Sequence, residues 1–148
     1  MRKPQHTVTD DYVSLPLFSD LAPRELRAIA GAATRLDLPA GSRVAVQGSR
    51  RVEFGVITRG TASVARDGRA LGTLHPGDHF GEFVTLRGVR CPATVVADSP
   101  ITVAVFSGPE FRSLIASSDI VRTRIEREID RRIRDWVRSP LPSELATA

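Results

Sequence analysis

The stretch from His75 to Val95 holds the residues whose types and spacing are best suited to chemistry, beginning with His75-Pro-Gly-Asp-His-Phe-Gly-Glu82. Gly81 has no side chain, so the backbone at that point can approach a ligand closely. The amides of Glu82, Phe83 and Val84 follow at the start of a short helix, where unpaired N–H groups favour an anion. Because its own charge repels an anion, the Glu82 carboxylate is better suited to accept hydrogen bonds from a sugar hydroxyl. The pattern predicts a phosphate-sized pocket.

Other chemistries find less support in the same stretch. His75, His79 and Glu82 have a loose resemblance to metal ligands, but both histidines flank a Pro-Gly-Asp turn and no third histidine is near. We therefore expect ordinary turn histidines and no metal site. Cys91 is either a redox-sensitive thiol, if nearby arginines lower its pKa, or a small buried residue, which is the favoured interpretation. No nucleophile or carboxylate is arranged with a histidine base, so no catalytic residue and no enzyme activity are predicted.

The elements around this stretch indicate a mainly β fold with flanking helices. Short β-prone runs punctuated by turns extend from residue 34 to residue 106, and Asp67-Gly68 is a strong two-residue hairpin signal. Strands this short, separated by frequent turns, are typical of a sandwich or a small roll. The expected strands contain residues 36–38, 44–46, 54–58, 62–64, 69–74, 93–97 and 101–106.

Helices are predicted at both ends of the β-rich region. The first covers about 22–33 and opens with Pro23 after the poor N-cap Ala22, which leaves Glu25 without a capping-box partner. Ser107-Gly-Pro-Glu110 is a capping box that opens a helix to Ala116, and a longer helix runs from about Ser118 to Val137. The expected organisation is a flexible arm at 1–13, one domain at 14–138 and a flexible tail at 139–148.

Length and composition fit one soluble domain. The chain has 148 residues, and no window approaches the ~20 apolar residues that span a bilayer. One cysteine excludes an internal disulfide and fits a reducing compartment, so we expect a cytoplasmic protein without a secretory signal. The net charge is only +4 despite a pI near 10.5, because all basic residues but one are arginine. Nucleic acid and membrane are therefore not expected partners.

The residues quoted above, taken in order, resemble the cyclic-nucleotide-binding domain family of the catabolite activator protein and the protein kinase A regulatory subunit. The resemblance covers roughly residues 15–137 and rests on Pro39-Ala-Gly41, Arg59-Gly60, Asp67-Gly68, Pro76-Gly-Asp-His-Phe-Gly-Glu82 and Ala93-Thr-Val95. It implies a double-stranded β-helix, a jelly-roll-like β-roll, with one N-terminal and two C-terminal helices. It also implies that Glu82 holds the ribose 2′-hydroxyl, that the helix amides hold the cyclic phosphate, and that a cassette arginine neutralises that phosphate.

The sequence departs from the family pattern at that arginine. It normally stands two residues before the alanine equivalent to Ala93, where this chain has Cys91, and the next residue, Pro92, has no N–H to donate. Arg90 and Arg87 are the candidate substitute cations, although neither has the family position. Loss of the charged contact is expected to weaken cyclic-nucleotide binding by about ten to several hundred fold.

The last helix is the best clue to a partner protein. Residues 119–138 carry seven arginines and five acids, and the apolar side chains fall on one stripe that includes Ile125, Ile129, Ile133 and Trp136. Glu128 and Arg132 form an i,i+4 pair away from that stripe. We expect a homodimer through this helix; the alternative is a helix packed only on its own roll. Nucleic-acid binding is not favoured, since the acids nearly balance the arginines.

Two functions remain open at this point. The first is a sensor or regulatory module that binds cyclic AMP, cyclic GMP or a related anion weakly through Gly81-Glu82, with no cofactor. The second is a ligand-independent dimerising scaffold with a vestigial pocket. Catabolite-activator relatives append a helix-turn-helix after the long helix, and only ten residues follow here. The output is therefore expected to come from a partner protein.

Overall fold

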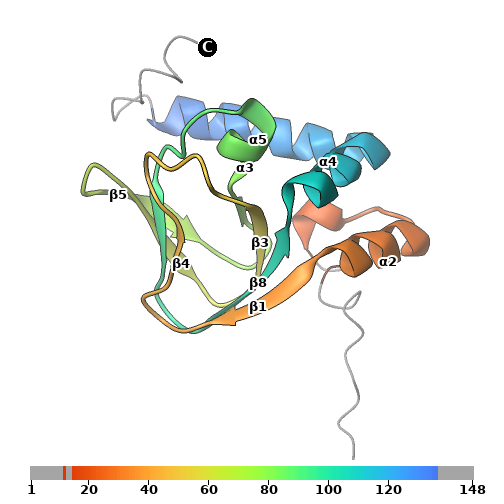
Figure 1. Ribbon diagram of the computed structural model, residues 1–148, viewed down its shortest axis with the longest axis horizontal. Helices are drawn as coiled ribbons and strands as arrows, with labels where there is room; N and C mark the ends of the chain where they lie inside the picture. Colours follow the sequence, from red (N-terminus) through yellow and green to blue (C-terminus); the bar gives the residue numbers. More distant parts are fainter. Residues whose placement is uncertain (1–11, 13–14, 137–148) are drawn as a thin grey trace, which may run out of the picture.

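The computed structural model describes residue 12 and residues 15–136, which form two four-stranded sheets flanked by helices (Figure 1). The strands are β1 (Thr34–Leu38), β2 (Arg43–Ala45), β3 (Phe54–Arg59), β4 (Ala62–Arg66), β5 (Arg69–Leu74), β6 (His79–Phe80), β7 (Thr94–Ala97) and β8 (Ile101–Phe106). The helices are the 3₁₀ turn η1 (Pro16–Phe18), α2 (Pro23–Ala32), α3 (Glu82–Arg87), α4 (Gly108–Ser117) and α5 (Asp119–Trp136).

Strand pairing makes the molecule a β-roll. One sheet has the order β1-β8-β3-β6 and the other β2-β7-β4-β5, with every pair antiparallel. The first strand thus pairs with the last and each following strand with the next one inward, down to the β4–β5 hairpin. That nested order is the double-stranded β-helix expected from the sequence, and the predicted mainly β fold with flanking helices is confirmed.

The β4–β5 hairpin turns where the sequence predicts. Asp67 and Gly68 have φ values of 51° and 79°, so both residues of the turn lie in the left-handed region. A two-residue turn of this kind matches the right-handed twist of the flanking strands. The Gln47 side chain holds the turn through bonds in both directions with Asp67, at 2.8 and 2.9 Å.

Two apolar cores lie on either side of the sheet that contains β3 and β8. The interior of the roll is filled from both sheets by residues such as Ile57, Val64, Val95 and Val103. The second core lies between that sheet and the helices; its members include Phe54, Phe106, Phe111, Val121, Ile125 and Ile129. Because helix α5 contributes to the second core, it is fixed across the end of the roll where the cavity described below opens.

The described part of the apolar stripe of α5 packs on its own roll. Val121, Ile125 and Ile129 have no exposed surface, and Ile133 is packed against the same core. The predicted dimer seam is therefore wrong for Ile125 and Ile129, because helices α4 and η1 and the sheet already bury those side chains, whereas Ile133 is only partly buried and its predicted role in a dimer stays a prediction. The Trp136 side chain lies outside the described residues. Within the described part of the chain, no helix is both long and apolar enough to cross a bilayer.

Two details at the N-terminus differ from the sequence interpretation. Tyr12, expected in a flexible arm, is buried in the helix-side core with its ring edge on Phe18 at 5.6 Å. The rest of the 1–13 arm and the 139–148 tail lie outside the described residues. Glu25 does find a capping partner, since its carboxylate accepts the backbone N–H of Ala22 at 3.1 Å, although alanine has no oxygen to return the bond.

Candidate functional site

A small cavity opens between the roll and α5, beside the start of α3. Its volume is about 40 Å³. The lining comes from four places: the stretch Phe80–Val84, the stretch Cys91–Ala93, the inward-facing residues Ala45, Val64, Leu74 and Val95, and Arg132 of α5. Seven of the nine predicted ligand-binding residues therefore meet at one cavity: Gly81, Glu82, Phe83, Val84, Cys91, Pro92 and Ala93.

Glycine at position 81 is what lets α3 begin at the cavity. Gly81 has φ 87°, in the left-handed region, and a Cβ placed there would lie 2.2 Å from the carbonyl oxygen of Glu53. No other residue type fits that backbone and that contact together. Gly88, with φ 67°, ends the six-residue helix. Glu82 is thereby the first helical residue and points into the molecule.

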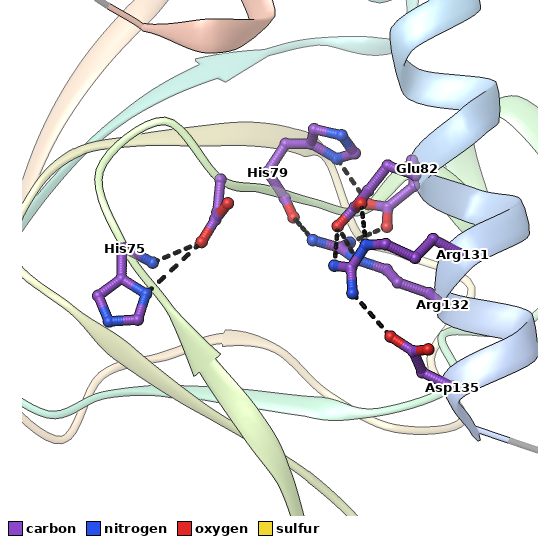
Figure 2. Close-up of polar contacts among 8 residues, drawn as sticks. His75, His79, Glu82, Arg131, Arg132 and Asp135 are labelled. Carbon is purple, nitrogen blue, oxygen red and sulfur yellow. Dashed lines mark hydrogen bonds and ion pairs between the residues drawn. The ribbon is translucent and has the colours of Figure 1, made fainter.

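Glu82 is a fully buried carboxylate held by two neighbours. Its side chain is 1% exposed and is bonded to the Arg132 guanidinium, while the imidazole Nδ1 of His79 lies 3.4 Å from Oε2 (Figure 2). Burial alone would raise the pKa of Glu82, but the charges of Arg132 and His79 outweigh it and hold the pKa at about 2. The carboxylate is therefore ionised across the physiological range.

Arg132 is the functional residue that the sequence analysis missed. Instead of lying in solvent, its side chain is 8% exposed and reaches from α5 into the cavity. Its Nη2 donates to the backbone oxygen of His79 at 2.7 Å and its Nε to Glu128 at 3.1 Å, in addition to the bond with Glu82. The predicted Glu128–Arg132 pair exists, but Arg132 does not lie away from the buried side of the helix, because its guanidinium is bonded to the buried Glu82.

Helical spacing carries a signal for that placement. Arg132 follows the buried Ile129 by three residues, which puts it about 60° from Ile129 around the helix axis. An arginine at such a position is normally expected to be exposed unless a buried acidic side chain faces it. Here that acid is Glu82, 50 residues earlier in the chain. Arg131, the preceding residue, is 54% exposed and bridges Glu128 and Asp135; Figure 2 shows its contact with Asp135.

The part of the cavity wall formed by Cys91 and Pro92, where the resemblance places the cassette arginine, carries no charge in this chain. Cys91 is buried, and its thiol donates to the carbonyl oxygen of Ala93 at 3.1 Å. Burial raises the pKa of the Cys91 thiol, so it stays protonated and uncharged. The interpretation of Cys91 as a small buried residue is the one that agrees with this geometry. Pro92, beside it in the lining, has no N–H to donate.

Neither substitute cation reaches the cavity. Arg90 is exposed and its guanidinium donates to the carbonyl oxygen of Gly48 at 3.1 Å. Arg87 is exposed in the last turn of α3. Among the residues that the structure describes, Arg132 is the one cation that lines the cavity.

The two histidines of the turn lie apart. His75 is largely exposed beside Asp78, with Nδ1 3.8 Å from the carboxylate, whereas His79 is buried against Glu82 and the ring of Phe54. No group of three or more metal-ligating side chains occurs in the described part of the chain. The contact that matters for the site is thus His79 with Glu82.

The arrangement presents a hydrogen-bond acceptor in an otherwise apolar cavity. Among the described residues, Glu82 Oε2 and His79 Nδ1 are buried polar atoms without a hydrogen-bond partner. These two atoms face each other at 3.4 Å as an ion pair without a well-formed hydrogen bond, and a buried carboxylate oxygen in that state is suited to accept a donor from a ligand, such as a hydroxyl. The arrangement is suited to binding a ligand.

Comparison with known proteins agrees with the fold. The model of the cyclic nucleotide-binding domain matches residues 35–118. The chain is 32% identical over 112 residues to the cAMP-dependent protein kinase regulatory subunit of Schizosaccharomyces pombe, covering 74% of this chain and 27% of that protein. The chain spans about a quarter of the length of the curated relatives it matches.

Solved structures give the same result for the fold. PKAR CBD2 bound to Sp-2Cl-cAMPS superposes with a TM-score of 0.80 at 19% identity, over 88% of this chain and 87% of that one. The catabolite activator protein of Thermus thermophilus superposes with a TM-score of 0.72 at 26% identity, over 81% of this chain and 59% of that one. The family model over residues 35–118 and the 32% identity to the Schizosaccharomyces pombe subunit, together with this fold, show that the chain belongs to the cyclic nucleotide-binding domain family.

Proposed function

We propose that this chain is a cytoplasmic regulatory domain that binds a cyclic nucleotide, cyclic AMP or cyclic GMP, weakly in the cavity beside Glu82. The observation that carries the proposal is the buried, ionised Glu82 carboxylate, which lines the cavity and whose Oε2 has no hydrogen bond among the described residues, only the ion pair with His79 at 3.4 Å. Glu82 stands where the family places the residue that holds the ribose 2′-hydroxyl. A partner protein would receive the signal.

Weak binding follows from the neutral wall of the cavity. A cyclic phosphate beside Cys91 would meet a protonated thiol already bonded to Ala93, and Pro92 cannot add an amide. A hydrogen bond to a charged group contributes about 1.5–3 kcal/mol, and an unneutralised buried phosphate costs more. We therefore expect affinity about ten to several hundred fold below that of a site with the cassette arginine.

Binding also requires the cavity to open. Sites for ligands of this size occupy about 300–1,000 Å³, whereas this cavity measures about 40 Å³ with Arg132 in place. A nucleotide can enter only when Arg132 withdraws from the lining of the cavity and the end of α5 shifts with it. Occupancy of the site is thereby coupled to the position of α5, which is the physical basis for a regulatory role.

A titration of the full chain with cyclic AMP and cyclic GMP tests the proposal. Ligand at 100 times its dissociation constant stabilises the folded state by about 2.7 kcal/mol, which raises the melting temperature by roughly 5 °C for a domain of this size. Calorimetric titration gives the affinity directly. No change in melting temperature and no heat at millimolar concentrations of either nucleotide would overturn the proposal.

Substitution of Cys91 isolates the missing charge. Cys91→Arg places a guanidinium at the family position, and we expect it to raise cyclic-nucleotide affinity at least about tenfold. Cys91→Ser is the matched control, since it changes the same buried side chain without adding charge and should leave affinity close to that of the natural chain. Equal affinities for the two variants would show that the phosphate is not bound at this wall.

The second candidate function is a ligand-independent structural module with a vestigial pocket. It is favoured by the contact between Glu82 and Arg132, because the protein's own guanidinium then satisfies the ribose-binding carboxylate. This alternative predicts that cyclic nucleotides bind neither the natural chain nor Cys91→Arg, while both remain folded. It does not depend on a dimer through α5.

A further inference from the structure

Strand β1 combines a free edge with exposed side chains on both faces, unlike the other strands of its sheet. It is the terminal strand of its sheet and pairs only with β8, so among the described residues its outer edge has no partner strand. Its first four residues are all exposed, on both faces. Leu36, at the middle of the strand, is 40% exposed and is one of three large apolar side chains exposed to that degree in the described chain. In Figure 1, β1 runs along the lower border of the molecule, away from α5.

Free strand edges of this kind are usually protected by charge. An unpaired edge offers alternating N–H and C=O groups to any other strand, and charged side chains normally deter that pairing. Here the strand is Thr34-Arg-Leu-Asp-Leu38, with opposite charges on either side of Leu36. The side chains of Arg35 and Asp37 are 51% and 67% exposed and only loosely paired with each other, at 3.5 Å.

The charges are complementary to those of a second copy. In an antiparallel pairing centred on Leu36, Arg35 of each copy lies opposite Asp37 of the other, and the two Leu36 side chains lie opposite each other. A shift of the register by two residues places Arg35 opposite Arg35, or Asp37 opposite Asp37. Opposite charges across a strand pair stabilise it and like charges destabilise it, so one register is favoured.

We propose that the free edge of β1 is a self-association surface, on which the β1 strand of a second copy pairs antiparallel about Leu36. The two sheets then join across a two-fold axis into one continuous sheet. This assembly uses neither α5 nor the nucleotide cavity, so its test is independent of the test of the proposed function. With five residues from each copy the contact is small, and the association is weak and salt-dependent.

Sedimentation of the full chain across a range of protein concentrations tests the surface. We expect reversible dimers at high micromolar concentration that dissociate as salt is added. Arg35→Asp places acid opposite acid at both ends of the pairing and should weaken association at least about tenfold. Arg43→Asp is the matched control, because it makes the same charge change on an exposed residue of β2, in the other sheet, and should leave association unchanged.

A charge-swap experiment tests the register. Arg35→Asp and Asp37→Arg should each associate poorly alone and should pair with each other when mixed. Asp37 also accepts the Thr102 hydroxyl at 2.7 Å, so folding of Asp37→Arg is checked by circular dichroism. Leu36→Cys gives a readout independent of charge, since mild oxidation should link two copies through the thiols at the axis, whereas Thr73→Cys on β5 should remain unlinked.

The results that overturn the proposal are clear. They are a full chain that stays monomeric at millimolar concentration, a dimer that Arg35→Asp does not weaken, or Leu36→Cys chains that do not cross-link. Occupation of the β1 edge by residues 1–11 of the same chain, or by a strand of a different protein, would leave the full chain monomeric and would therefore count against a second copy.

Discussion

Replacing Arg132 by methionine tests the central contact of the site. Methionine keeps the length and apolar stem of the side chain but removes the guanidinium. Three bonds are then lost together: those to the Glu82 carboxylate, the His79 backbone oxygen and Glu128. Glu82, 1% exposed, is left as a buried charge without its cationic partner.

Two approaches give similar magnitudes for the loss. Removing one member of a buried ion pair typically costs about 3–5 kcal/mol, because the other charge stays buried without compensation. The depression of the Glu82 pKa from 4.5 to about 2 corresponds to about 3 kcal/mol of interaction favouring the charged form. We therefore expect Arg132→Met to lower the free energy of unfolding by about 3 kcal/mol.

Urea denaturation followed by circular dichroism at pH 7 measures that loss, and two variants serve as controls. Arg131→Met removes an arginine of the same helix whose side chain is 54% exposed, and it should cost less than about 1 kcal/mol. Glu82→Gln combined with Arg132→Met removes both charges and should recover much of the stability lost by Arg132→Met alone. Equal losses for the Arg132 and Arg131 variants, or no recovery in the double variant, would refute the reasoning.

Two further predictions concern the same helix start. The pKa of Glu82 is lower in the folded chain than its ordinary 4.5, so its contribution to stability is complete above about pH 4.5 and is lost as the pH falls toward about 2. Over that pH range, the urea midpoint of Glu82→Gln should therefore fall less steeply than that of the natural chain. Gly81→Ala should cost at least about 2 kcal/mol in the same assay, because of the positive φ and the 2.2 Å approach to Glu53, whereas Gly31→Ala, at a helical site with open space, should stabilise α2 by about 0.5–1 kcal/mol.

Local patterns in the sequence were enough to predict the roll and the cassette. Alternating apolar residues, the Asp67-Gly68 turn and the capping box at Ser107 act over a few residues, and the observed strands, hairpin and α4 follow them. The position of Glu82 after Gly81 is likewise local, since a left-handed glycine forces the helix to begin there. A side chain whose contacts come from residues nearby in the sequence can be placed from the sequence alone.

The residues that were misplaced depend on contacts between distant segments. Arg132 is buried because a carboxylate 50 residues earlier faces it, and Tyr12 because Phe18 and the helix-side core cover it. The isoleucines of α5 show the same limit: their stripe is apolar whether it faces a second copy or its own roll. Spacing along a helix identifies which face is buried and cannot identify what buries it.

The packing of α5 decides how the cavity can open. Val121, Ile125 and Ile129 are fully buried, and exposing a side chain of this size costs about 1.5–3 kcal/mol. Lifting all three would consume a large part of the stability of an ordinary domain, about 5–15 kcal/mol. Arg132 lies beyond these anchors, in the final turns of the helix. Only the one or two turns of α5 beyond Ile129, which carry Arg132, can shift while these three side chains stay buried, so any opening of the cavity is confined to the last part of the helix.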